Sequence, residues 1–275
     1  MRGRDIGWSV GLTGKEGWGF VRSDFWRIME HTPGGSFVAR MGPRRVGMLT
    51  TMCHGRTCWI GNVVVERHFR NLGIGKLLVR AALDFASGKG MERTALLSRE
   101  RTVGFYAAMG FSRDGRYAGY GGRPRTAGAH PDIVRATPGH FPEVARLDRD
   151  ACDGERRRLL RLLWRDFAGY FLVYSEKGSV MGFIVGKPGR GLVDVGPWVA
   201  VRGRADVASA LFRALASRTG KRLEVYVPGN KRAMRMLVGM GLKRTAGFVE
   251  MHQGGRARSS SKKVDMLAVA GLEKG

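Results

Sequence analysis

The same order of predicted strands and helices occurs twice in this chain, and this internal repeat constrains the fold more than any other feature of the sequence. The first half predicts a hairpin, a strand, a long helix, a strand and a short helix over residues 36–51, 59–65, 74–85, 94–97 and 103–109. The second half repeats this order over residues 171–185, 193–199, 208–215, 223–227 and 233–240. A repeat of about 100 residues is too long for a solenoid and indicates two duplicated domains.

A glycine-rich stretch separates the two repeats. Residues 119–130 read GYGGRPRTAGAH, a composition that is typical of a linker. We therefore predict one domain over residues 1–125 and a second domain over residues 126–275.

Two glycines mark the junction between the third strand and the long helix of the first repeat. Residues 63–76 read VVVERHFRNLGIGK, so an apolar strand leads through Gly73 and Gly75 into the helix. The N–H groups of a first helical turn are unpaired and carry a partial positive charge. Glycine lets the backbone approach an anion closely, and Arg70 and Lys76 add positive charge. The junction therefore predicts a phosphate-binding site.

Two familiar phosphate motifs do not fit this junction. The dinucleotide fingerprint needs a third glycine three residues after the second, where this chain has Leu78, and the P-loop needs Ser or Thr where it has Leu77. The pattern that fits is Arg-x-x-Gly-x-Gly from Arg70 to Gly75, followed by Phe-Tyr-x-x-x-Gly-Phe over residues 105–111. Together, in this order, the two motifs resemble the GNAT superfamily of acetyl-CoA-dependent N-acetyltransferases.

The resemblance extends over nearly the whole chain. Residues 59–65 (WIGNVVV), 193–200 (VDVGPWVA) and 226–242 (YVPGNKRAMRMLVGMGL) are similar to a tandem-GNAT family, in which a typical acetyl-CoA-binding half is joined to a degenerate one. The similarity implies two tandem GNAT folds of the α/β (α+β) class, each with a mixed, mostly antiparallel twisted sheet and flanking helices. Residues 1–15 are short for the family's first strand and helix, so either the first strand is abbreviated or the start differs from the family's.

The resemblance also implies a coenzyme site in the first half, with acetyl-CoA as co-substrate between two parallel strands that splay apart, residues 59–65 and 94–97. Backbone groups of the first strand would pair with the pantetheine, an N–H near Val64 would polarise the thioester carbonyl, and the glycine turn would hold the pyrophosphate. The residues that the resemblance assigns to coenzyme binding are Val63, Val64, Val65, Arg70, Asn71, Leu72, Gly73, Ile74, Gly75, Lys76 and Phe105. It implies no metal.

Two residues are expected to carry the chemistry of acetyl transfer to a primary amine by direct attack. Tyr106 stands where the family has the tyrosine that protonates the departing thiolate. Glu66 directly follows the binding strand and is the candidate base, although a carboxylate there equally suits a solvated strand end. Trp18 and Trp198 are candidates for the walls of the acceptor site or, alternatively, for the core.

The second half lacks these features. Gly203 stands alone where the first half has its glycine turn, and the nearby Asp206 would repel a pyrophosphate. Leu237 stands where the first half has Tyr106, and Asn230 is expected to cap the helix that follows it. We therefore expect a structural or acceptor-binding second domain, and one acetyl-CoA per chain.

The chain is strongly basic, with 48 lysines and arginines against 23 acidic residues, a formal net charge of +25. This charge favours an anionic ligand or nucleic acid, but no nucleic-acid-binding motif accompanies it. Two alternatives to a small-amine acetyltransferase therefore stay open. One is a nucleic-acid- or ribosome-associated acetyltransferase, and the other is a non-catalytic acetyl-CoA sensor.

Membrane and secretion signals are absent from the sequence. The sequence has no run of about eighteen apolar residues, the length that spans a bilayer. Residues 1–5 lack the apolar stretch of a signal peptide. We predict a cytoplasmic protein, a monomer or a homodimer, with no membrane partner. The cysteines Cys53, Cys58 and Cys152 have no metal-ligand spacing and are expected to be reduced thiols.

Overall fold

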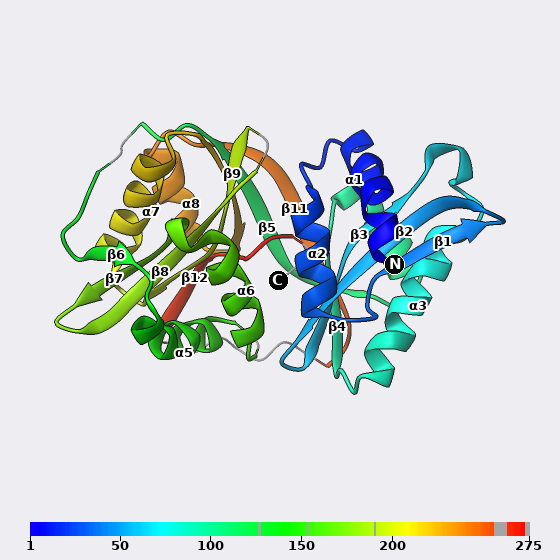
Figure 1. Cartoon of the computed structure of the whole chain (residues 1–275), viewed down its shortest axis with the longest axis horizontal. Coiled ribbons are helices and arrows are strands. Elements are labelled where there is room, and N and C mark those ends of the chain that lie inside the picture. The colour runs from blue at the N-terminus through cyan, green and yellow to red at the C-terminus, as the bar shows by residue number, and fades with distance from the viewer. Residues whose placement is uncertain (126–127, 153, 190, 256–262, 273–275) are drawn as a thin grey trace. The chain divides into compact units, whose positions relative to one another are not determined.

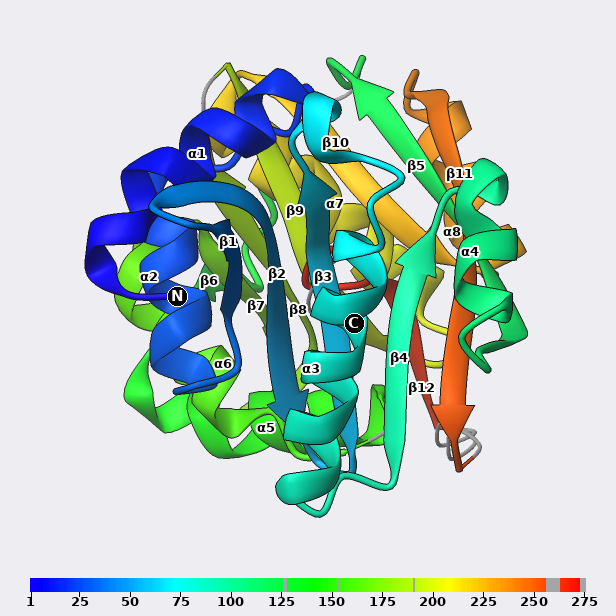
Figure 2. The same ribbon diagram turned by 90° about the vertical axis from the view of Figure 1, so that its right-hand side faces the viewer.

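Both halves of the sequence form mixed sheets covered by helices, as Figures 1 and 2 show. The computed structural model describes residues 1–125, 128–152, 154–189, 191–255 and 263–272. The chain divides into two units, which are taken separately below. The predicted fold class, an α+β arrangement with mostly antiparallel strands, is confirmed in both.

Unit 1 contains the elements of the first repeat. They are η1 (Gly3–Asp5), α1 (Ile6–Lys15), α2 (Arg22–His31), β1 (Phe37–Met41), β2 (Arg44–His54), β3 (Thr57–Val65), η2 (Arg67–Phe69), α3 (Ile74–Gly88), β4 (Arg93–Ser98), η3 (Glu100–Thr102) and α4 (Val103–Ala107). The strand order is β1-β2-β3-β4, and the C-terminal end of β11 (Lys243–Gly254) follows β4. Unit 1 thus takes part of one strand from the second half of the sequence.

Unit 2 contains the elements of the second repeat and most of β5. They are β5 (Ser112–Gly122), β6 (Ile133–Arg135), η4 (Pro138–His140), α5 (Phe141–Ala151), α6 (Arg157–Phe167), η5 (Ala168–Tyr170), β7 (Phe171–Glu176), β8 (Ser179–Pro188), β9 (Leu192–Val201), α7 (Ala205–Thr219), β10 (Arg222–Pro228), α8 (Lys231–Gly239), β11 and β12 (Val264–Ala268). The strand order is β11-β5-β10-β9-β8-β7-β6, and β12 pairs with β9. The strands β5 and β11 each pass from one unit to the other. The domain boundary predicted at residue 125 therefore stays a prediction about the two sequence repeats.

Helices cover both faces of the central strands in each unit. In unit 1, α3 packs against β2 and β3, and α2 also packs against β2. The side chains of β2 are buried at every position from Val46 to Met52, which requires cover on both faces. In unit 2, α7 and the pair α5 and α6 cover β8 in the same way. Within the described residues, no helix is both long and apolar enough to cross a bilayer.

The predicted linker at residues 119–130 is wrong at its start, because Gly119 to Gly122 form the end of β5. These glycines pair with β10, from Tyr226 opposite Gly119 to Leu223 opposite Gly122. A Cβ on Gly119 would lie 2.9 Å from the hydroxyl of Thr245 and 3.3 Å from the Tyr226 ring. Glycine is therefore used here for close packing of neighbouring side chains and not for chain flexibility.

Helices come before the first strand of unit 1. Residues 1–36 are all described, and they form η1, α1 and α2 with no strand before β1. Asp5, buried at the start of α1, accepts hydrogen bonds from Arg40 and Arg45 at 2.9 and 2.7 Å. These ion pairs attach the first helix to the hairpin of β1 and β2.

The prediction of reduced thiols is wrong for Cys53 and Cys58, which form a disulfide. The two residues lie directly opposite each other in the antiparallel hairpin of β2 and β3. Their separation along the chain gave no sign of this pairing, because it depends on the register of the hairpin. Cys152 forms no disulfide within the described residues, and its thiol donates to the carbonyl of Asp148 at 2.9 Å.

A buried ion pair joins α5 to the start of α6 in unit 2. Arg156 donates to Asp148 through Nε at 3.0 Å and through Nη2 at 2.7 Å, and the two side chains are 1% and 0% exposed. Removing one partner leaves a buried charge without compensation, which costs about 3–5 kcal/mol. We therefore expect Arg156→Ala to lower the denaturant midpoint of unit 2 strongly, as measured by circular dichroism in urea.

The matched control for this change is Arg157→Ala. Arg157 is the next arginine and pairs at the surface with Glu155, where both side chains are about half exposed. Exposed pairs contribute about 0–1 kcal/mol, so this control should unfold close to the unchanged protein. Equal effects of the two variants would contradict the structural role of the buried pair.

Candidate functional site

The strands β3 and β4 separate part of the way along their length, which leaves one edge of β3 open. They pair in parallel from Thr57 opposite Arg93 to Ile60 opposite Leu96, and the pairing ends there. A bulge follows in β3, where the register against β2 shifts and Asn62 adopts a positive φ of 53°. The predicted splay between the two strands is thus present in the structure.

The hydrogen-bond pattern shows which peptide groups face the open edge. The N–H of Glu66 donates to the carbonyl of Val46 at 2.8 Å, so these two residues form a hydrogen-bonded antiparallel pair. Hydrogen-bonded and non-hydrogen-bonded residue pairs alternate along an antiparallel ladder, so every second residue of β3 directs its N–H and C=O groups toward β2. The peptide groups of Val64 therefore face β2, and those of Val65 face the open side. The amide of Val65 is therefore an N–H near Val64 that faces the open side, in keeping with the expected place of an oxyanion donor.

The loop before α3 presents a row of free amides. Asn71 and Gly73 have positive φ angles of 67° and 77°, which turns the chain sharply into the helix. The first helical hydrogen bond runs from the N–H of Leu77 to the carbonyl of Gly73 at 3.1 Å. Among the described residues, the amides of residues 71–76 donate no hydrogen bond of good geometry within the protein. Consecutive unpaired amides at a helix N-terminus form an anion-binding site.

The two cations expected at this loop differ in their surroundings. Arg70 folds back onto its own unit, where Nε donates to the carbonyl of Val65 at 3.0 Å and Nη2 contacts Glu16 at 2.6 Å. Lys76 is exposed on the first turn of α3. Lys76 is therefore free to meet an anion at the loop, whereas Arg70 fixes the end of β3 to the segment after α1.

Phe105 and Tyr106 in α4 lie beside this loop. A Cβ on Gly75 would lie 3.3 Å from the Phe105 ring, so the second glycine of the motif is in contact with α4. The Phe105 and Tyr106 rings are 4.9 Å apart between centroids, and Tyr106 packs on Phe111 at 6.0 Å. The two motifs of the sequence are thus brought together by packing of Gly75 on Phe105.

Burial raises the pKa of the Tyr106 phenol to about 12. The hydroxyl therefore stays protonated across the neutral range, as a proton donor must. Because the pKa is raised in the folded state, the buried neutral phenol makes its full contribution to the free energy of unfolding below about pH 10, the usual tyrosine pKa. It is lost as the pH rises through about 12.

We expect this shift to be visible in an ultraviolet titration. One tyrosine should ionise near pH 12, and its signal should be missing from Tyr106→Phe. A difference spectrum between the two proteins measures it directly. Ionisation of Tyr106 near pH 10, the usual value, would show that its surroundings are open to water.

Glu66 is held by two neighbours. Its Oε2 accepts from Arg44 at 3.2 Å and its Oε1 accepts from the indole N–H of Trp8 at 3.4 Å, and its side chain is 14% exposed. Arg44 also lies over the Phe69 ring at 4.7 Å. The sequence analysis missed Trp8 and Arg44, because no local spacing links them to Glu66.

The two tryptophans proposed for the acceptor site have different environments. Trp18 is half-buried and packs on an apolar cluster that includes Leu12 and Phe25 of α1 and α2. Trp198 is fully buried in the core of unit 2, with its ring 5.1 Å from that of Phe212. A side chain with no exposed surface does not wall an open site, so the proposal for Trp198 is corrected to a core role.

Comparisons with known proteins give the family. Residues 12–111 match the model of the acetyltransferase (GNAT) family, and residues 144–264 match that of the acetyltransferase (GNAT) domain. The uncharacterised N-acetyltransferase YitH of Bacillus subtilis (strain 168) is 23% identical over 193 residues, which are 68% of this chain and 66% of that protein. The chloroplastic serotonin N-acetyltransferase 2 of Oryza sativa subsp. japonica is 36% identical over 55 residues, 20% of this chain and 28% of that protein.

Solved structures share the fold over the full length. A candidate acetyltransferase from Pyrococcus horikoshii superposes with a TM-score of 0.83 at 21% identity, over 100% of this chain and 94% of that one. A tandem GNAT protein from the clavulanic acid biosynthesis pathway has a TM-score of 0.62 at 16% identity, over 93% and 96%. The chain spans just under two thirds of the first curated relative and less than a third of the second. Since both halves match GNAT models and the whole chain has a tandem fold, the chain belongs to the GNAT family of N-acetyltransferases, with two GNAT domains in tandem.

Proposed function

We propose that unit 1 transfers the acetyl group of acetyl-CoA to a primary amine by direct attack. The observation that carries this proposal is the row of free amides of residues 71–76, which lies at the N-terminus of α3 and follows the open edge of β3. An extended amide-containing arm needs such an edge, and a pyrophosphate needs such a turn. The donors present therefore fit the coenzyme.

Two parts of the coenzyme, the pantetheine arm and the pyrophosphate, have candidate residues in this chain. The peptide groups of Val63 and Val65 are the candidates for the pantetheine arm, and Val65 would then share its carbonyl between that arm and Arg70. The amides of residues 71–76 and the side chain of Lys76 are the candidates for the pyrophosphate. When bound, the coenzyme supplies the activated acetyl thioester. The protein places it beside α4.

Tyr106 is the proposed proton donor to the leaving thiolate. Its phenol is protonated at neutral pH because burial raises its pKa to about 12. The packing of Phe105 on Gly75 fixes α4 next to the loop that would hold the coenzyme.

Glu66 is the proposed acceptor of the amine proton, and its contacts equally suit a residue that fixes the end of β3. A Glu66→Gln variant separates the two roles, because the amide keeps the shape but cannot take a proton. If Glu66 is the base, kcat falls on the order of 10²–10⁴ and the acidic limb of the pH–rate profile disappears. An unchanged profile with a lower melting temperature assigns the positioning role instead.

The test of the proposed function is a thermal shift followed by an acceptor screen. Acetyl-CoA should raise the melting temperature, because a ligand that binds only the folded state stabilises it. Small amines, amino acids, polyamines and peptides are then offered with acetyl-CoA, and free thiol is measured. No thermal shift and no thiol release with any amine would overturn the proposal.

A further inference from the structure

The second repeat contains the same divergence of strands that opens the site in unit 1. In unit 2, β9 and β10 pair in parallel from Leu192 opposite Arg222 to Val195 opposite Val225, as many positions as β3 and β4 pair. The cis peptide Gly196-Pro197 follows, at the place where β3 has its bulge. Counted from the last parallel pair, Trp198 of β9 corresponds to Val63 of β3.

In unit 1 the edge of β3 is open beyond its last pair with β4, whereas in unit 2 the corresponding edge of β9 is covered by β12. The strand β12 pairs antiparallel with β9, with Ala268 opposite Trp198 and Val264 opposite Val201. By the same count, these partners correspond to the stretch from Val63 to Glu66. The chain thus places its own extended strand on the edge that would hold a pantetheine arm.

Residues 264–270, which contain β12, also form hydrogen bonds to elements other than β9. The N–H of Val269 donates to the carbonyl of Tyr226 in β10 at 3.1 Å. Asn230 caps α8 as predicted, and its Nδ2 also donates to the carbonyl of Met266 at 3.3 Å. Lys187 donates to the carbonyl of Ala270. These bonds tie the segment to β10, to α8 and to β8.

Side chains of this segment are packed into the interior of unit 2. Leu267 and Val269 are each 2% exposed. A Cβ on Gly196 would lie 1.9 Å from the carbonyl oxygen of Val269, so that only glycine allows the segment to lie where it does. The strand is therefore part of the core of unit 2.

An exposed carboxylate of the chain lies at the start of α7, where unit 1 has its glycine turn. Asp206 lies in the first turn of this helix, where its side chain accepts from the amide of Val207. Arg204 donates to Asp206 at 2.9 Å and to Glu176 at 2.9 Å. The helix start that would hold a pyrophosphate already holds an internal anion with its own arginine.

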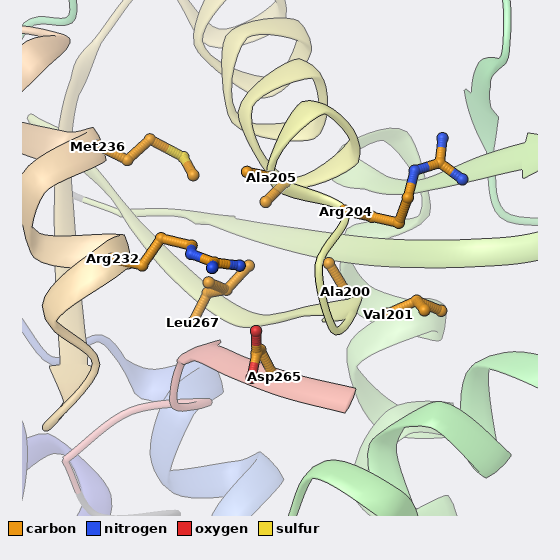
Figure 3. A pocket seen from close by; sticks show the side chains of 9 residues that line it. Ala200, Val201, Arg204, Ala205, Arg232, Met236, Asp265 and Leu267 are labelled. Atoms are coloured by element: carbon orange, nitrogen blue, oxygen red, sulfur yellow. The ribbon is translucent and has the colours of Figure 1, made fainter. Parts of the chain in front are cut away.

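Figure 3 shows the small hollow that remains between these elements, with Arg232 and Met236 of α8 facing Asp265 and Leu267 of β12. Asp265 is paired with Arg202 at 2.9 Å. Ala200 and Val201 of β9 also line this hollow, but their backbone is paired with Asp265 and Val264 of β12.

We propose that β12 covers the edge of β9 as an internal ligand and that Asp206 repels a phosphate at the start of α7, so that unit 2 binds no acyl-CoA. The strand takes the place of the pantetheine arm, and the exposed carboxylate disfavours a pyrophosphate beside it. One coenzyme per chain follows, a number that also rests on the proposed function of unit 1. The second GNAT domain is then a closed domain held by its own C-terminal strand.

The first test counts bound acetyl-CoA by equilibrium dialysis on the full chain and on Gly73→Asp, which places a carboxylate in the loop of unit 1. One equivalent on the unchanged protein and none on the variant support the proposal. Two equivalents on the unchanged protein overturn it. One equivalent on each protein shows that the pyrophosphate is not held at Gly73, and the second test then decides on unit 2. No binding to the unchanged protein removes the proposed function of unit 1, and the second test then decides on unit 2.

The second test follows amide hydrogen exchange with and without saturating acetyl-CoA. The amides of β12 should be protected in the free protein and unchanged by the coenzyme, while those of residues 71–76 become protected. Fast exchange of β12 in the free protein would show that the cleft is not closed. Loss of its protection on addition of acetyl-CoA would show that the strand leaves to admit the ligand. Either result overturns the proposal.

Discussion

Replacing Tyr106 with Phe is expected to lower kcat on the order of 10²–10⁴ and to leave the affinity for acetyl-CoA nearly unchanged. The change removes only the hydroxyl, which burial keeps protonated with a pKa of about 12. The ring contacts with Phe105 and Phe111 remain, so the loop around Gly75 keeps its support. The measurement is steady-state thiol release with the best acceptor of the amine screen, together with the dissociation constant of acetyl-CoA.

Tyr120→Phe is the matched control for this experiment. Tyr120 is a buried tyrosine in β5, within unit 2, and losing its hydroxyl should leave turnover unchanged. If Tyr106→Phe keeps kcat within about twofold, the proton donor is another group. If the unchanged protein has no turnover but binds acetyl-CoA, the chain is a sensor and Tyr106 has a packing role only.

Replacing Gly73 with Asp is expected to weaken acetyl-CoA binding by on the order of 100-fold or more. Two charges at about 4 Å near a protein surface interact by about 4 kcal/mol, and a carboxylate in this loop would face the pyrophosphate. The space around Gly73 is open, since a Cβ would meet no atom within 4 Å. The effect therefore comes from charge and not from a clash, and calorimetry or a thermal shift measures it.

Gly73→Asn isolates this charge from the backbone. The φ angle of Gly73 is 77°, in the left-handed region that Asn and Asp tolerate better than other side chains. Asn has nearly the shape of Asp and the same backbone strain, so it should bind acetyl-CoA within about tenfold of the unchanged protein. Equal losses for Asn and Asp would show that backbone strain is responsible. Normal binding by both would place the pyrophosphate elsewhere.

Local signals in the sequence were sufficient for the glycine turn before α3 and for the elements around it. The stripe of apolar residues predicts a helix after Gly73, and α3 runs from Ile74 to Gly88. The hairpin, the strand that follows it and the short helix of Phe105 and Tyr106 were also predicted close to their observed bounds. Each depends on contacts within a few residues, such as helical periodicity or a turn that needs glycine.

Partners of single side chains were beyond the sequence. The sequence suggested Arg70 as a phosphate ligand, but its guanidinium contacts Val65 and Glu16. Glu66 is bound by Trp8, from which it is separated by 58 positions. Such pairs form because the fold brings distant segments together, and no local pattern records them.

By itself, the sequence determined that this chain contains two copies of one fold and that only the first keeps a glycine turn for a phosphate. The tertiary structure decided how the second copy is closed. A final strand was expected from its apolar residues, but its place on β9 depends on pairing with residues far earlier in the chain. The same long-range pairing turned Gly119 to Gly122 into strand and buried Trp198, whereas the register of the β2–β3 hairpin joined Cys53 to Cys58. Backbone hydrogen bonds in a sheet are made between distant segments, so strand identity is local information and strand partnership is not.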